Sequence, residues 1–133
     1  MEINSRCVLM NPDFHDGLLT GVTMEHGTLE LRLTDIREKR WSLIVPQILA
    51  VSATNLLKAN TVFEIEIFYK QKLTFNVEDS IDTFYFGENL RDVADAVSQG
   101  KLMVLRIGTS FGTDLVAVST APLSDLRIAP LHV

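Results

Sequence analysis

The sequence predicts a mainly antiparallel β domain of the α+β class, with about eight short strands and one helix near residues 90–99. Apolar residues alternate with polar ones in several segments, which is typical of strands with one wet face. The connections are mostly too short to hold crossover helices, which favours antiparallel pairing. Such strands form a sandwich or an open barrel, with the helix covering one end or face. Since no linker interrupts the 133 residues, we expect a single domain over 1–133.

Strands are expected through the first half of the chain, after a turn-rich cluster at residues 11–17. The alternation is clearest at 28–34, where three leucines alternate with polar residues. His26 and Gly27 form a tight turn before this segment, and Pro46 marks a break because proline donates no ladder hydrogen bond. The expected strands cover 18–25, 28–34, 41–45 and 48–52.

The second half is expected to hold further strands around the helix. Residues 62–69 alternate apolar with acidic side chains, and 101–107 are apolar on both faces, which indicates a central strand. In the helix, Asn89 suits the N-cap, apolar residues recur at i, i+3, i+4 and i+7, and Gly100 suits the C-terminal end. Shorter strands are expected at 73–77, 82–87, 114–119 and 126–129, and 53–60 is either a helical turn or a packed loop.

The charge and the apolar content of the chain limit its partners. Twelve basic residues against seventeen acidic ones give a net charge of −5, which opposes a phosphate backbone, so we expect no nucleic acid partner. The densest basic stretch, residues 37–40, is interpreted as a solvated turn. No apolar run approaches the roughly 18 residues of a membrane span, so no membrane partner is expected. Because hydrophobic residues make up 47% of a small chain, a homodimer that covers apolar surface is a further hypothesis.

Cys7 is the single cysteine, so the chain forms no intrachain disulfide. The first residues do not resemble a signal peptide, and the two observations together favour a cytoplasmic location. We assign Cys7 no basic partner that would lower its pKa, so we expect no reactive thiol.

Residues 108–112 match the G-x-S-x-G pattern of the serine hydrolase nucleophile elbow, with Ser110 as the serine. Asp114 or Asp125 and then His132 follow in the order of a catalytic triad. An elbow leads into a helix, however, whereas the residues after this motif have the pattern of a strand, and His132 stands in the last two residues. We therefore interpret the motif as a hairpin loop and assign no catalytic residue.

His15, Asp16 and Asp13 form a second polar group, with His26 further along the chain. Their spacing fits no metal-ligand signature, and roughly 35 Å of strand would separate the two histidines. We expect the carboxylates to bind turn amides, and we assign neither metal nor cofactor. Glu64 and Glu66 are interpreted as a solvent-facing row. Aromatic residues are assigned to the core: Phe63, Phe68, Tyr69, Phe75, Phe84, Tyr85 and Phe86.

Three segments near the two ends of the chain form a further pattern. The first is Phe14-His15-Asp16-Gly17 with Leu19 and Gly21, the second is Gly27-Thr28-Leu29-Glu30-Leu31, and the third is Ser110-Phe111-Gly112-Thr113-Asp114-Leu115-Val116-Ala117. The pattern resembles that of a set of small bacterial β-rich proteins of unknown function. The resemblance implies a bacterial cytoplasmic setting and a hairpin at Ser110, and it carries over no catalytic residue.

Two hypotheses for the function follow. The first is a non-catalytic protein-interaction or binding module, since an acidic domain with an available sheet edge suits a basic protein partner. The alternative is a small-molecule or metal-binding site, with enzymatic activity left open, at the mouth of the open barrel or sandwich near His15, Asp16 and Ser110. Enzymatic activity is less favoured than binding without catalysis.

Overall fold

The computed structural model describes residues 1–53, 60–74, 77–78, 90–109 and 114–131. The strands within these ranges are β1 (Glu2–Ile3), β2 (Leu9–Asn11), β3 (Leu18–Glu25), β4 (Thr28–Thr34), β5 (Arg40–Val45), β6 (Ile48–Ala53), β7 (Asn60–Phe68), β8 (Met103–Thr109), β9 (Asp114–Ser119) and β10 (Arg127–Pro130). The helices are α2 (Leu90–Ser98) and the short 3-10 helix η1 (Leu123–Asp125).

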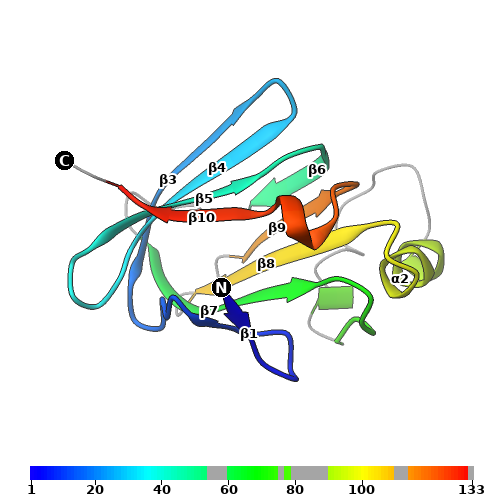
Figure 1. The fold of residues 1–133 in the computed structure, drawn as a ribbon, viewed down its shortest axis with the longest axis horizontal. Helices are drawn as coiled ribbons and strands as arrows, with labels where there is room; N and C mark the ends of the chain where they lie inside the picture. Colours follow the sequence, from blue (N-terminus) through cyan, green and yellow to red (C-terminus); the bar gives the residue numbers. More distant parts are fainter. Residues whose placement is uncertain (54–59, 75–76, 79–89, 110–113, 132–133) are drawn as a thin grey trace.

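Eight strands form one antiparallel sheet in the order β10-β5-β4-β3-β7-β8-β9-β6, and β1 pairs with β2 in a second, two-stranded sheet. Figure 1 shows the course of the chain through this sheet. Strands β10 and β6 stand at the two ends of the order, and the sheet is not closed into a barrel. The prediction of a mainly antiparallel α+β fold is therefore confirmed.

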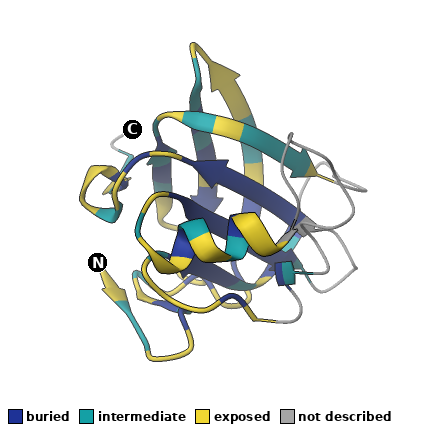
Figure 2. Cartoon of the chain, turned by 90° about the vertical axis from the view of Figure 1, so that its right-hand side faces the viewer, coloured by how far each residue is buried: buried dark blue, intermediate teal, exposed yellow. Residues whose placement is uncertain are grey.

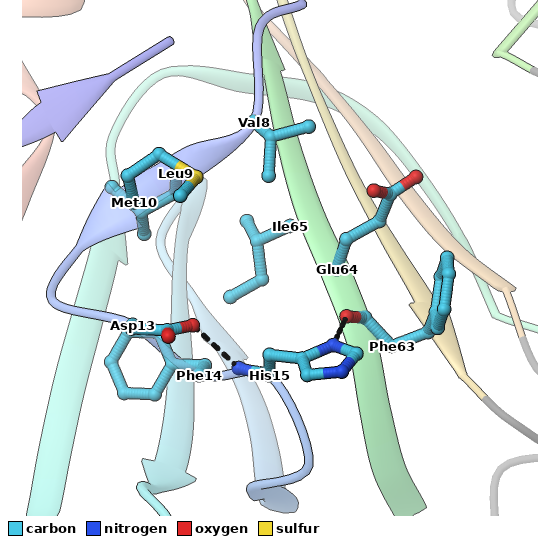
Figure 3. A pocket seen from close by; sticks show the side chains of 9 residues that line it. All are labelled: Val8, Leu9, Met10, Asp13, Phe14, His15, Phe63, Glu64 and Ile65. Atoms are coloured by element: carbon cyan, nitrogen blue, oxygen red, sulfur yellow. Dashed lines mark hydrogen bonds between the residues drawn. The ribbon is translucent and has the colours of Figure 1, made fainter.

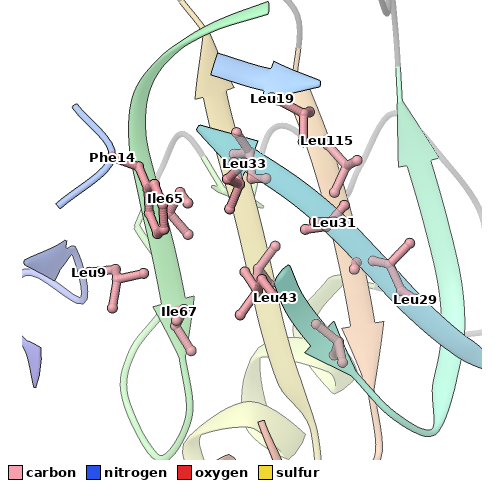
Figure 4. Close-up of a cluster of buried hydrophobic side chains, with 14 of the residues drawn as sticks. Leu9, Phe14, Leu19, Leu29, Leu31, Leu33, Leu43, Ile65, Ile67 and Leu115 are labelled. Carbon is pink, nitrogen blue, oxygen red and sulfur yellow. The ribbon is translucent and has the colours of Figure 1, made fainter. Parts of the chain in front are cut away.

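The large sheet has two halves, β10-β5-β4-β3 and β7-β8-β9-β6. A hydrophobic cluster joins these two halves (Figure 4). Leu29 and Leu31 of β4 and Leu43 of β5 are fully buried in it, and so are Leu105 of β8 and Leu115 of β9, to within 1%. Residues from both halves meet in one cluster, so the halves face each other across it. The alternating leucines of 28–34 therefore form the dry face of β4, as their spacing predicts.

Helix α2 covers the other face of strands β7 to β9. Val93 and Val97 on its apolar stripe are fully buried in a second cluster, together with Phe68 and Val104 of the sheet. Figure 2 shows a buried and an exposed side along this helix. Because Leu105 belongs to the first cluster and Val104 to the second, β8 is buried on both faces, as expected for a central strand. No helix in the described part of the chain is long and apolar enough to cross a membrane.

The two halves of the large sheet are joined by a short pairing, which we call the seam. Strand β3 pairs with β7 only at Leu18↔Thr61 and Leu19↔Asn60. Two backbone hydrogen bonds extend the seam on one side: Asp16 N donates to Val62 O (2.9 Å), and Val62 N donates to Gly17 O (2.8 Å). The loop that precedes β3 is therefore fixed at the junction of the halves.

The charged turn before β5 is organised by Asp35. Its carboxylate accepts hydrogen bonds from the backbone N–H groups of Arg37 and Lys39 and from Nε1 of Trp41. Burial raises the pKa of Asp35, but these hydrogen bonds outweigh it, and the pKa lies below its usual value. Arg37 and Lys39 are exposed, which agrees with the prediction of a solvated turn.

Some expectations differ from the structure. The strand expected at 73–77 is not seen at the described residues of that range: Leu73 and Thr74 have no regular structure, and Val77 is helical, as is the following Glu78. Strands β1 and β2 were not expected, because two or three residues are too few for an alternating pattern. The strand expected at 82–87, residues 54–59 and the N-cap Asn89 lie outside the described residues.

The interpretation of two β7 side chains is corrected. Glu66 is not in a solvent-facing row but is 5% exposed, because Arg106 of β8 lies opposite it and donates from Nη1 to Glu66 Oε1 at 2.6 Å. Phe63 is not in the core but is 53% exposed, while Phe68 is buried as expected. Phe75, Phe84, Tyr85 and Phe86 lie outside the described residues.

Candidate functional site

Residues 13–17, the His15 loop, lead into β3 and are held in place by backbone hydrogen bonds. Gly17 N donates to Phe14 O at 2.8 Å, and His15 N donates to Asp13 Oδ1 at 2.9 Å. Asp16 has a φ of +63°, a conformation that aspartate tolerates better than most residues. Phe14 is 2% exposed and contacts Trp41 edge-on, with the ring centres 6.0 Å apart. The buried phenylalanine anchors the loop, and the polar residues on either side of it face outward.

The imidazole of His15 is oriented by a backbone carbonyl of β7. Its Nδ1 lies 2.6 Å from Phe63 O, and its ring meets that of Phe63 edge-on, with the ring centres 5.6 Å apart. Since a carbonyl oxygen can only accept a hydrogen bond, Nδ1 carries the proton, and in the neutral ring Nε2 is an acceptor. Asp16 Oδ2 lies 3.6 Å from Nε2, and both side chains are more than half exposed, at 62% and 54%.

The pKa of His15 is raised above its ordinary value. The hydrogen bond to Phe63 O is the main cause, followed by the carboxylate of Asp16, and Asp13 and Glu64 add smaller contributions against a small opposing effect of desolvation. Protonated His15 therefore favours the folded state. This stabilisation is fully present below the unfolded pKa of about 6.5 and is lost as the pH rises through the higher folded value.

The Asp16→Asn variant should show a lower His15 pKa than the wild type, because it removes the nearest carboxylate but keeps the bond to Phe63 O. The pKa is measured by following the ring carbon protons by NMR across a pH titration. Asp95→Asn, an exposed carboxylate on helix α2, is the matched control and should leave the titration midpoint unchanged. An equal midpoint in all three proteins would contradict this account of the raised pKa.

A cavity of about 300 Å³, the His15 pocket, lies between the His15 loop, β2 and β7 (Figure 3). Leu9, Phe14 and Ile65 are buried, at 4%, 2% and 2% exposed, and provide its apolar floor. Asp13, Glu64 and His15 provide its polar groups. Its lining is completed by Val8, Met10 and Phe63. None of these nine residues is a lysine or an arginine, so the pocket combines an apolar floor with an acidic rim.

A second, more open cavity of about 360 Å³ shares Asp13 with the His15 pocket. Asp35, Arg37 and Trp41 line it with Ile36, Asn11, Pro12 and Asp13. Here an arginine accompanies two carboxylates, and Asp35 already accepts three hydrogen bonds from its own turn. The His15 pocket therefore has the less compensated negative charge and is the stronger candidate site.

The structure brings together part of the predicted site. His15 and Asp16 lie side by side in the His15 loop, and Asp13 binds a turn amide as expected. Ser110 lies outside the described residues, as does His132. His26 lies in the turn at the far end of β3 with a 91% exposed side chain, which agrees with the predicted separation from His15. Among the described residues, no group of three or more His, Cys, Asp or Glu side chains is placed to hold a metal ion.

Glu64 and Phe63 are the site residues that the sequence did not reveal. They lie on β7, almost fifty residues from His15, and the seam brings them to it. Their sequence signal is the start of the alternating run at 62–69, but alternation alone does not say which strand pairs with which.

Cys7 is buried and does not contribute to the site. Burial raises the pKa of its thiol, and the nearby carboxylate of Glu66 raises it further. A reactive thiol needs the opposite shift, toward the thiolate.

No family model matches this chain, and neither the curated proteins nor the solved structures contain a match to it.

Proposed function

We propose that this chain is a non-catalytic binding module whose His15 pocket holds an organic cation, an amine or guanidine on a short apolar arm. The observation that carries the proposal is the composition of the pocket lining: six apolar residues, Asp13, Glu64 and His15, without a lysine or arginine. The buried floor suits an apolar arm, and the two carboxylates suit a cationic end.

The size of the pocket supports a small occupant. A volume of about 300 Å³ is at the lower limit of the cavities that hold small molecules. A cation of this size is either a free small amine or the end of a lysine or arginine side chain from a basic protein partner. The net charge of −5 favours the approach of either.

The proposal assigns binding rather than catalysis because of the chemistry of the lining. Among the described residues that form the pocket there is no serine, threonine, cysteine or lysine to act as a nucleophile. His15 is held by Phe63 O, whose hydrogen bond is the main cause of its raised pKa, and the pocket carboxylates of Asp13 and Glu64 add smaller contributions.

Butylguanidinium should bind in the millimolar range, and butyrate, with a comparable arm and the opposite charge, should not bind. Binding is measured by amide chemical shifts in a ¹⁵N-labelled sample, with the largest changes at Val8–Met10, His15 and Phe63–Ile65. Affinity should fall with added salt, and it should fall between about pH 8 and pH 5 as His15 gains its proton.

The Asp13→Asn and Glu64→Gln double variant should lose this binding, whereas Asp95→Asn on α2 should keep it. A short peptide with arginine between two leucines distinguishes the two sources. Binding about tenfold tighter than butylguanidinium indicates a protein partner, and equal or weaker binding indicates a free small molecule. The proposal would be overturned if butyrate gave equal chemical shift changes, or if neither butylguanidinium nor the arginine peptide gave any.

A further inference from the structure

The two ends of the eight-stranded sheet differ in a way that points to a second partner surface. Strand β10 pairs only with β5, and strand β6 pairs only with β9 among the described strands. The outer edge of such a strand presents unpaired N–H and C=O groups that can extend the sheet into another chain.

Strand β10 carries features that oppose such an extension. It has four residues, Arg127 places a charge at its start, and Pro130 at its end has no N–H to donate. Short length, charge and proline are the usual protections of an edge strand.

Strand β6 lacks these three protections, although its pairing with β9 is irregular between Ile48 and Ala50, as at a β-bulge. Its six residues, Ile-Leu-Ala-Val-Ser-Ala, include no charge and no proline. None of them is buried, and Leu49 is 58% exposed, whereas Leu115 to Ser119 of the neighbouring β9 are all buried. One outward group is already used, because Ile48 N donates to Gly27 O in the β3–β4 turn at 2.8 Å. No other strand in the described part of the chain pairs with residues 49–53, which form an uncharged and mostly apolar edge.

We propose that residues 49–53 of β6 pair antiparallel with the same residues of a second copy of this chain, which gives a two-fold homodimer with one continuous sheet. An uncharged strand suits a copy of itself, since no like charges stand opposite each other across the axis. A basic partner would gain nothing from this edge. If β6 paired with β10 of another copy, it would lie beside Arg127 and Pro130, and each added subunit would leave a further edge open. Pairing of β6 with β6 instead gives a closed dimer of two subunits.

Sedimentation equilibrium of the full chain should show a dimer at tens of micromolar, and the dimer should become tighter with added salt, because salt screens the repulsion between two chains of net charge −5. This salt dependence is opposite to the one expected for the His15 pocket. The Leu49→Lys variant should dimerise at least about tenfold more weakly, since it places a lysine on the edge of both copies.

Met24→Lys is the matched control: Met24 is as exposed as Leu49, at 54% against 58%, but lies on β3, and this variant should dimerise like the wild type. Amide hydrogen exchange of wild type at low and high protein concentration is an independent measurement, and concentration should protect residues within 49–53. A monomer at every salt concentration, an undiminished Leu49→Lys dimer, or concentration-dependent protection elsewhere would overturn the proposal.

Discussion

Replacing Glu66 with alanine should lower the free energy of unfolding by about 3–5 kcal/mol. Glu66 on β7 and Arg106 on β8 lie opposite each other, joined by a 2.6 Å bond from Nη1 to Oε1, with side chains 7% and 13% exposed. The variant leaves the guanidinium of Arg106 in a site that excludes most water, without the carboxylate that balances its charge. The measurement is urea unfolding, followed by the fluorescence of Trp41, the single tryptophan.

The double variant Glu66→Leu with Arg106→Leu is the control for this prediction. It removes both charges and fills the space with apolar atoms, so it should be less destabilised than the Glu66→Ala single variant. A loss below about 1 kcal/mol in the single variant would mean that the pair is screened as an ordinary surface salt bridge is.

Gly17→Ala should cost about 2–3 kcal/mol and should disturb the His15 site as well. A Cβ at this position would overlap the backbone carbonyl oxygen of Thr34 and would stand 3.0 Å from Phe14 O. The backbone cannot yield without loosening the hydrogen bonds between Gly17 and Val62 that extend the seam. The same urea titration gives the stability. The NMR titration should show a lower His15 pKa, because the ring loses its place against Phe63 O.

Gly21→Ala in strand β3, which follows the loop, is the matched control. There the nearest atoms to an added Cβ belong to the side chain of Arg32, at 3.5 Å or more, which is an ordinary contact distance. This variant should change the stability by less than about 1 kcal/mol and leave the His15 pKa as it is. If both glycine variants behave alike, the close approach of Gly17 to β4 does not determine the position of the loop.

Local patterns predicted the elements well where one face of a strand is dry. The expected strands at 18–25 and 28–34 coincide with β3 and β4, and the expected strand at 114–119 coincides with β9, although β9 is buried on both faces. Gly100 ends helix α2 with a φ of +76°, the conformation for which glycine is preferred at this position. In each case a side chain pattern a few residues long records a local physical requirement, either alternate burial or a left-handed backbone.

Long-range pairing could not be predicted in the same way. The burial of Glu66 depends on Arg106, forty residues away, and neither residue has a local signal of a partner. The orientation of His15 depends on the carbonyl of Phe63, a backbone group that every residue has. The sequence therefore indicated His15 and Asp16 as candidates but not the pocket, because the pocket is a product of strand order.

Backbone hydrogen bonds fix the shape of the His15 loop, whereas its exposed side chains determine which polar groups it presents. Main-chain atoms of Asp16, Gly17 and Val62 hold it to the rest of the domain, while the side chains of His15 and Asp16 are more than half exposed. Exchanging these outward groups should therefore cost little folding free energy. Other polar groups could thus be placed on this loop without a redesign of the interior.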